Sequence, residues 1–281
     1  MDPLVFFVVL LAAALHAGWN ALVKNAGDKH VSMTAVVLGH APLAILALPF
    51  VPLPNSESWP FVIASVIFHI GYQLLLLFSY RIGDLTQVYP IARGAAPLIV
   101  AGVSVMVLGV QLSATETLAV LAIAIGIISL VFVRGSDGIR NTPAALMALA
   151  TGCCIAGYSL VDGLGARQAG TALGFWVWIT LINVVVFPII MIKLKPGLIG
   201  RVAREGRSLL VFGGGASFLA YALVIWAFTQ APIPLVTALR ETSIIFALLI
   251  GVLFLNERLN VVKVASTALT LFGAVLLRFS R

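Results

Sequence analysis

Two arginines stand inside long apolar segments, where a charged side chain is costly. Arg93 and Arg240 each lie about seven residues into such a segment, roughly 10 Å deep at ~1.5 Å per residue. Placing a charge in hydrocarbon costs roughly 2.5–3.5 kcal/mol, so such residues usually face a cavity. Because a guanidinium suits a carboxylate, we interpret both arginines as gates or as groups that hold an anion. Alternatively, they hold a broken helix end or extend to the membrane surface.

Two acids accompany the arginines, and each is open to two interpretations. Glu241 follows Arg240 directly but lies about 100° further around a helix. We therefore interpret it as a lone buried carboxylate that needs another partner. It could carry a proton, or it could bond backbone groups at an unwound segment. Asp162 is a second candidate for a gating or proton-linked role, although a helix-end charge within reach of water would explain it as well.

Aromatic, amide and imidazole side chains in the apolar segments are candidates for the wall of a substrate cavity. Tyr72 recurs as Tyr221 at a shift of 149. Trp19 recurs as Tyr158 at a shift of 139. Such side chains stack on flat substrates and offer hydroxyl hydrogen bonds, although ordinary packing with a polar tip is the alternative. The cavity candidates are Trp19, Asn20, His69, Tyr72, Gln73, Tyr89, Tyr158, Tyr221, Trp226 and Arg240.

Other ring side chains carry weaker indications. His16 and His40 could relay protons like His69, but a helix-to-helix hydrogen bond is the commoner role for such a histidine. Trp59 is typical of an anchor at the membrane interface, and Trp176 is a candidate for the same role. No two histidines have metal-ligand spacing, so we expect no metal and no cofactor.

The elements that must position these residues are membrane helices. Hydrophobic residues make up 61 % of the chain and charged residues only 10 %, more apolar surface than a water-soluble domain needs. A crossing needs roughly 20 apolar residues, and the runs are continuous, which excludes a transmembrane barrel. The ten predicted spans lie near residues 3–24, 32–52, 60–82, 86–109, 114–133, 144–164, 170–192, 208–229, 233–254 and 260–279.

The same five-span unit is written twice. At a shift of 147, Arg93 falls on Arg240 and Glu241 falls on Gly94. An odd number of crossings returns the chain on the opposite side, so the two units must be inverted relative to each other. The sequence therefore predicts an all-α membrane protein of ten transmembrane helices in two inverted repeats, residues 1–138 and 139–281. This architecture is typical of secondary transporters with a site at the repeat interface.

Small residues around Gly126 and Gly273, which align at the same shift, predict close packing of the fifth and tenth spans against a neighbour. That neighbour could be another subunit, but a ten-span unit contains both repeats. We therefore expect the protein to function as a monomer.

The distribution of basic residues predicts the orientation. Loops after the odd-numbered spans hold twelve lysines and arginines, whereas those after the even-numbered spans hold only Arg167. The positive-inside rule then places the odd loops in the cytoplasm and both termini outside. The segment 193–207 is expected to lie against anionic headgroups. We interpret the first span as uncleaved, because Met1, Asp2 and Pro3 give no basic leader. The net charge of +7 thus indicates no nucleic-acid partner.

The chain resembles the drug/metabolite transporter superfamily, in particular its EamA-type branch. The segments that carry the resemblance are residues 18–20 (GWN), 80–84 (YRIGD), 89–98 (YPIARGAAPL) and 255–259 (LNERL). The resemblance implies transport of small metabolites in a bacterial cytoplasmic (inner) membrane, and similar members include exporters of aromatic amino acids. We therefore expect a secondary transporter that exports apolar or aromatic amino acids by alternating access. The alternative is a proton-coupled exporter of cationic drugs; an enzyme is not expected, because the spans hold no catalytic motif.

Overall fold

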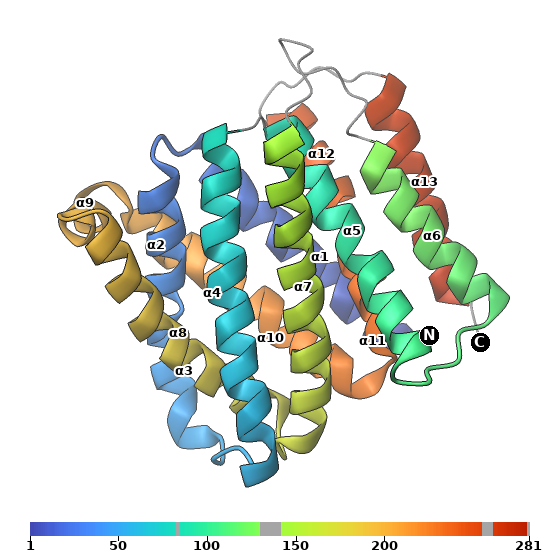
Figure 1. Ribbon diagram of the computed structural model, residues 1–281, viewed down its shortest axis with the longest axis horizontal. Coiled ribbons are helices and arrows are strands. Elements are labelled where there is room, and N and C mark those ends of the chain that lie inside the picture. The colour runs from blue at the N-terminus through green and yellow to red at the C-terminus, as the bar shows by residue number, and fades with distance from the viewer. Residues whose placement is uncertain (83–84, 130–141, 255–260, 280–281) are drawn as a thin grey trace.

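The apolar runs of the sequence are helices (Figure 1). The structure is a computed structural model that describes residues 1–82, 85–129, 142–254 and 261–279, without the side chains of 24–25, 80–90 and 263. No strand occurs in these ranges. The helices of the first half are α1 (Pro3–Asn25), α2 (Lys29–Gly39), α3 (Ala41–Ala47), α4 (Trp59–Ile82), α5 (Leu85–Met106) and α6 (Ala114–Ile128). Those of the second half are α7 (Thr142–Gln168), α8 (Ala172–Leu194), α9 (Leu198–Glu205), α10 (Gly214–Gln230), α11 (Ile233–Arg240), α12 (Ser243–Phe254) and α13 (Val261–Phe279).

The helical segments are long and apolar enough to form a membrane protein. In the described ranges, seven candidate spans occur together with three shorter apolar helices. Large apolar side chains such as Phe7 and Ile67 are more than half exposed, which suits contact with lipid rather than water. The predicted all-α membrane fold is confirmed. The count of ten spans and the inverted repeat stay predictions.

Polar residues at the helix starts explain where several helices begin. The Asp2 carboxylate accepts hydrogen bonds from the N–H groups of Leu4 and Val5 at 2.8 and 3.2 Å. At α6, Ser113 and Glu116 form a reciprocal capping box. Asp2 and the Ser113–Glu116 capping box each accept hydrogen bonds from backbone N–H groups that have no partner within the first helical turn.

Two predicted spans are each interrupted. The span predicted at 32–52 is formed by α2 and α3, and the span predicted at 233–254 by α11 and α12. Between α11 and α12 the N–H groups of Glu241 and Thr242 donate to the carbonyls of Ala238 and Leu239, both at 3.0 Å. This tighter turn places Arg240 and Glu241 at a break in the helix, inside the protein.

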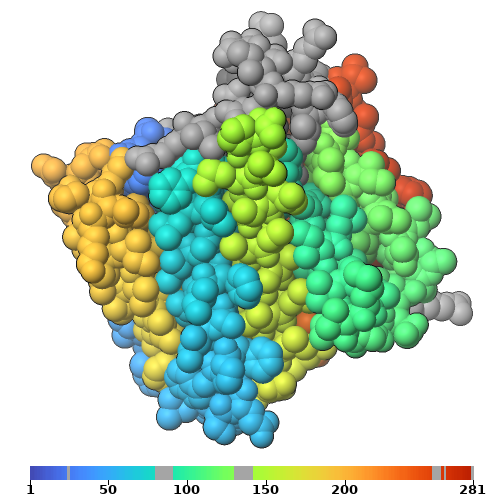
Figure 2. Space-filling model, viewed as in Figure 1, coloured from blue at the N-terminus to red at the C-terminus, as the bar shows by residue number. Residues whose placement is uncertain are grey.

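The two halves of the chain are packed into each other. Helices α4 and α5 of the first half pack on α7 of the second half. Helices α10 and α12 of the second half pack on α1 of the first half. Figure 2 shows one face of the molecule, where α4 and α7 lie side by side between α8 and the pair α5 and α6. A cavity between the halves is therefore enclosed by helices from both.

Helices α6 and α13 meet along a seam of small residues, at one edge of the molecule in Figure 1. A Cβ atom on Gly126 would lie 2.6 Å from Thr270 Oγ1, and one on Gly273 would lie 2.7 Å from the Ala119 carbonyl oxygen. Ser266 also donates its hydroxyl to the Gly126 carbonyl. The neighbour predicted for these two glycines is thus the other half of the same chain.

Gly273→Ala should lower the stability of the protein by about 1–3 kcal/mol, because the added methyl group meets backbone atoms that cannot move without separating the helices. The measurement is the thermal unfolding midpoint in detergent. Gly215→Ala in α10 is the matched control, since nothing lies within 4 Å of its added Cβ. Equal midpoints for the two variants would contradict the close seam.

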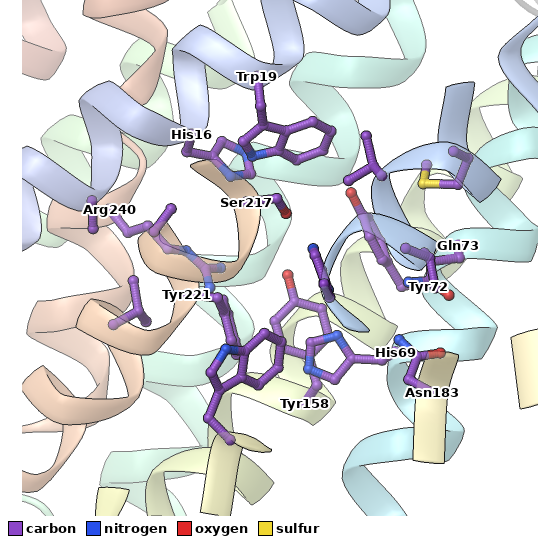
Figure 3. Close-up of a pocket in the computed structure, with 18 of the residues that line it drawn as sticks. His16, Trp19, His69, Tyr72, Gln73, Tyr158, Asn183, Ser217, Tyr221 and Arg240 are labelled. Atoms are coloured by element: carbon purple, nitrogen blue, oxygen red, sulfur yellow. The ribbon is translucent and has the colours of Figure 1, made fainter. Parts of the chain in front are cut away.

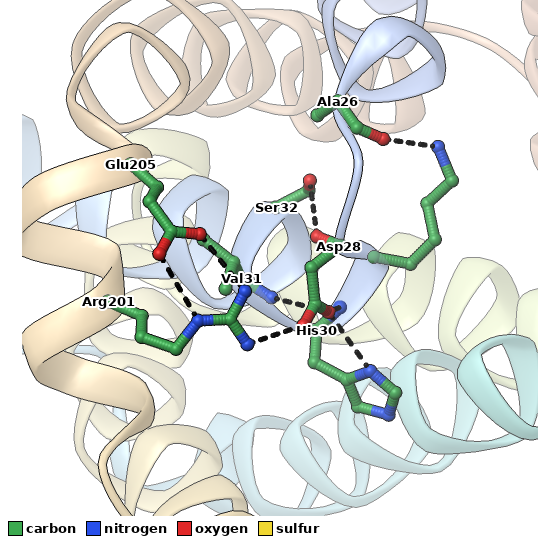
Figure 4. A network of polar contacts seen from close by, with 8 residues as sticks. Ala26, Asp28, His30, Val31, Ser32, Arg201 and Glu205 are labelled. Carbon is green, nitrogen blue, oxygen red and sulfur yellow. Dashed lines mark hydrogen bonds and ion pairs between the residues drawn. The ribbon is translucent and has the colours of Figure 1, made fainter.

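The loops after the first and seventh predicted spans meet on one face of the molecule. Asp28, between α1 and α2, accepts a 2.7 Å bond from Arg201 of α9, which also pairs with Glu205 at 3.0 Å (Figure 4). On the opposite face, the Asn55 amide donates to the Gln168 carbonyl at 2.9 Å. Both contacts join loops that the charge distribution places on the same side, without fixing which side is cytoplasmic.

The Asp28 carboxylate should make stability depend on pH. Partial burial raises the pKa of Asp28, but the bond from Arg201 and the N–H groups of His30 and Val31 outweigh it and lower the pKa to about 2. Because this lies below the ordinary value of 3.8, the stabilisation is complete above pH 4 and is lost as the pH falls towards 2.

Asp28→Asn keeps a helix-capping side chain and removes only the charge. At pH 7 it should lower the unfolding midpoint in detergent by about 1–2 °C, as expected for a surface pair. The gap between variant and wild type should shrink as the pH falls from 4 towards 2. A gap that stays constant over this range would contradict the ionic role of Asp28.

Candidate functional site

A cavity lies between the two halves of the chain (Figure 3). The space open to the centre of a water molecule is about 70 Å³, room for about five waters at ~15 Å³ each. Aromatic, imidazole, amide and guanidinium side chains form much of its wall. The cavity-lining residues with polar or aromatic side chains are His16, Trp19, His40, His69, Tyr72, Gln73, Arg93, Tyr158, Trp176, Asn183, Ser217, Tyr221 and Arg240.

Rings from four helices pack at one end of the cavity. His69 of α4 stacks on Tyr158 of α7, with ring centroids 4.2 Å apart and planes inclined by 14°. Tyr221 of α10 meets His69 edge-on at 5.2 Å. Trp176 of α8 lies 4.8 Å from Tyr221. Tyr72 and Tyr221, which the predicted repeat relates to each other, thus belong to one aromatic cluster, joined through Tyr158 at 5.8 Å from each.

Asp162 lies behind this cluster and is fully buried. Its Oδ2 atom accepts a 2.6 Å bond from the Tyr221 hydroxyl and lies 3.1 Å from His69 Nε2. Its Oδ1 atom has no hydrogen-bond partner among the described residues. The interpretation of Asp162 as a helix-end charge within reach of water is wrong, because α7 continues past it to Gln168 and α4 and α10 cover it.

Glu241 joins the two arginines. Its Oε2 atom lies 2.6 Å from Arg93 Nε, and its Oε1 atom lies 3.5 Å from Arg240 Nη2. Arg93 also donates to the Ser243 hydroxyl at 3.1 Å. The interpretation of Glu241 as a lone carboxylate is wrong, since its closest partner lies 148 residues away along the chain, in the other half.

Arg240 is buried, and two of its donor atoms make no hydrogen bond to the described residues. It lines the cavity and points into it (Figure 3), yet its Nε and Nη2 atoms have no hydrogen-bond partner in the described part of the chain. Its Cζ atom lies 5.7 and 5.9 Å from the ring centroids of Tyr158 and Tyr221. A buried guanidinium in this condition is costly, and an anion in the cavity would satisfy it.

Amide groups line the other side of the cavity. Gln73 of α4 and Asn183 of α8 lie together in Figure 3, across the cavity from Arg240. The Oε1 atom of Gln73 and the Oδ1 atom of Asn183 have no hydrogen-bond partner in the described ranges. Each amide can turn either its oxygen or its NH₂ group towards a ligand. The cavity therefore has spare donors on one wall and spare acceptors on the other.

The sequence profile of the EamA-like transporter family matches residues 142–279. The chain belongs to this family of membrane transporters, within the drug/metabolite transporter superfamily. A solved structure described as "Crystal structure of protein" matches with a TM-score of 0.73 over 97 % of this chain and 94 % of its own, at 16 % identity. At that identity the likeness shows the fold alone. No curated protein matches the chain.

The cavity of this EamA-like transporter contains eight of the residues predicted from the sequence. These are Trp19, His69, Tyr72, Gln73, Arg93, Tyr158, Tyr221 and Arg240. Asn20 lies outside the wall and donates to the His16 carbonyl at 2.8 Å. Trp226 packs against the apolar core. The side chain of Tyr89 lies outside the described residues.

Three wall residues of the transporter had no specific signal in the sequence. Asn183 and Ser217 sit in continuous apolar runs. Trp176 was interpreted as an interface anchor, which is wrong: only 3 % of it is exposed, and its indole donates to the Phe218 carbonyl at 3.2 Å. His16 and His40 also line the wall, although the sequence favours a helix-to-helix hydrogen bond for both. Within the described ranges no three acidic, histidine or cysteine side chains could hold a metal ion.

Proposed function

We propose that this EamA-like transporter moves small zwitterionic metabolites, most readily amino acids with apolar or aromatic side chains. The observation that carries the proposal is Arg240, a buried guanidinium at the aromatic cavity. Its Nε and Nη2 atoms have no hydrogen-bond partner among the described residues, and the Glu241 carboxylate approaches Nη2 only to 3.5 Å. A substrate carboxylate supplies the missing acceptors, and in a dry site such a charge-assisted bond is strong.

The opposite wall supports an ammonium group at the other end of the substrate. Gln73 and Asn183 offer carbonyl oxygens, and neutral oxygens can accept from an ammonium ion without trapping it as a fixed charge would. The spacing of spare donors and spare acceptors across the cavity favours a ligand with both signs of charge over a simple anion.

The aromatic wall supports an apolar or flat side chain. Tyr158, Trp176 and Tyr221 present ring faces and edges at the cavity. Rings of this kind stack on aromatic groups and cover aliphatic ones. A basic or acidic side chain would instead lose its hydration against these rings, so such amino acids are expected to be poor substrates.

Export by alternating access is the second part of the proposal. The units 1–138 and 139–281 would rock against each other as inverted repeats. The reciprocal packing of α4 on α7 and of α10 on α1 supports this, as does a cavity with walls from both halves. The charge distribution of the loops supports periplasmic termini. The family resemblance supports a bacterial inner membrane, and a ten-span unit that contains both repeats supports a monomer.

Counterflow in liposomes that contain only this protein tests the proposal. Vesicles are loaded with unlabelled phenylalanine, leucine, lysine, glutamate or a cationic dye, and uptake of the matching labelled compound is followed. Accumulation with phenylalanine and leucine, well above that with lysine and glutamate, is the expected result. Protein-free vesicles give the leak.

A cationic drug exporter is the second candidate, because the buried Asp162 beside the cavity could offset a positive charge. It requires counterflow with the dye and none with any amino acid. That result would overturn the amino-acid proposal. The charges of Arg93 and Arg240 favour the amino-acid reading.

A further inference from the structure

We propose that His69, Asp162 and Tyr221 form a proton-binding site, and that this site releases one proton when a substrate binds. The inference rests on the proposed function and goes beyond it, because it makes the protein a proton-coupled exchanger. The driving force for export would then be the entry of a proton through the same cavity.

The three residues form a single hydrogen-bonded unit that joins three helices and both halves. Asp162 of α7 holds Tyr221 of α10 at 2.6 Å and His69 of α4 at 3.1 Å, all through one oxygen. The other oxygen, Oδ1, is buried and has no hydrogen-bond partner in the described part of the chain. An ionised carboxylate would normally use both oxygens, so this environment also accepts a carboxyl group that carries a proton.

The unit has two charge states that differ by one proton. With the proton on His69 or on Asp162 the unit is neutral, either as an imidazolium–carboxylate pair or as imidazole with a carboxylic acid. Without it the unit carries one negative charge in a buried site, which is costly unless a cation lies nearby. Proton binding forms one N–H or O–H bond, and proton release breaks it and returns the proton to cavity water.

The path of the proton follows from what lines the cavity. The His69 ring is part of the wall, whereas Asp162 lies behind it. Nε2 of the ring faces the carboxylate, so Nδ1 is the atom through which a proton can enter from cavity water. Tyr221 holds the carboxylate in place as a donor.

A substrate ammonium group competes with this proton. Figure 3 shows His69 beside Asn183, on the acceptor side of the cavity, with Arg240 on the other side. A zwitterion with its carboxylate at Arg240 therefore brings its ammonium group next to His69. The positive charge favours the deprotonated unit, so substrate and proton exchange for each other.

The neighbouring charges act on the same unit. Tyr158 of α7 stacks on His69, and His40 after α2 lies close enough to interact with it electrostatically. Arg240 of α11 faces the rings of Tyr158 and Tyr221. Glu241, with Arg93 of α5, partly offsets Arg240. When the substrate carboxylate occupies Arg240, the ammonium group is the nearest unmatched charge to His69.

The test is a direct measurement of proton release. Purified protein in detergent is brought to pH 7 without buffer, phenylalanine is added, and the pH change is followed with a fluorescent pH indicator. Wild type should release protons when phenylalanine is added, up to one per protein at saturation, since one unit changes charge. Leucine should do the same. Asp162→Asn should release none, and Glu57→Gln, an exposed acid changed in the same way, should release as much as wild type.

His69→Gln is the second variant and should also release no proton. The wild-type measurement stands without any variant: no release, or uptake of protons on addition of phenylalanine, would overturn the inference. Counterflow by the wild-type protein distinguishes a failure of the proton coupling from a failure of the proposed function. Counterflow with phenylalanine but no proton release means that only the coupling is wrong. Absence of counterflow with every amino acid means that the proposed function has failed.

Discussion

Arg240→Ala should reduce the initial rate of phenylalanine counterflow about 100-fold or more. Truncating one member of a buried, hydrogen-bonded charge pair typically costs 2–5 kcal/mol. Arg240 is a buried cation at the cavity, and two of its donor atoms have no hydrogen-bond partner in the described ranges. Arg240→Lys keeps the charge but loses the planar fork, so about a tenfold loss is expected. The rate is measured at equal amounts of reconstituted protein.

The control for this prediction is Arg204→Ala, which removes an exposed arginine of α9. It should transport at the wild-type rate. Arg240→Ala keeps the Arg93–Glu241 pair, so its elution profile in size-exclusion chromatography should be unchanged. A properly folded Arg240→Ala that transports phenylalanine at more than half the wild-type rate would contradict the assignment of the carboxylate to Arg240.

Glu241→Gln should give the largest loss of stability. The substitution leaves two buried guanidiniums without their shared carboxylate, including the 2.6 Å contact to Arg93. Breaking a buried pair by removing one partner costs about 3–5 kcal/mol, which corresponds to a fall of about 10 °C in the unfolding midpoint. Thermal unfolding in detergent measures it.

A double variant separates lost charge balance from lost shape. In Arg93→Met/Glu241→Gln one unmatched charge is removed together with the acid, so the double variant should be more stable than Glu241→Gln alone. Glu116→Gln, which keeps a capping side chain at the exposed start of α6, should stay near the wild-type midpoint. A double variant less stable than both single variants would contradict the pairing.

The helices were predictable because the sequence carries their signal locally. Each apolar run of about 20 residues satisfies its own backbone in lipid only as a helix, and the predicted and observed ends differ by a few residues for most runs. The break between α11 and α12 was foreseen only as one alternative, an unwound segment at Glu241 or a broken helix end at Arg240, because a long apolar run does not show where inside it the helix is interrupted.

The wall of the cavity was predictable only where the two halves share residue types. Tyr72 and Tyr221 stood out because they recur at equivalent positions. Asn183 and Trp176 could not be placed, since α8 is apolar on every side and its sequence does not indicate which face meets the other helices. The pairing of Glu241 with Arg93 depends on two segments 148 residues apart, and no local pattern carries it.

The shared carboxylate also limits how the two halves can be exchanged. In the predicted repeat, Gly94 falls at the position in the first half that Glu241 holds in the second. A dimer of two first halves would bury two copies of Arg93 with no acid between them. A dimer of two second halves would bring together two acids and two arginines, a different charge balance in the same space. A dimer of either half would therefore lack the charge balance of the whole chain. A gene that had lost one half could not be restored by duplicating the half that remained.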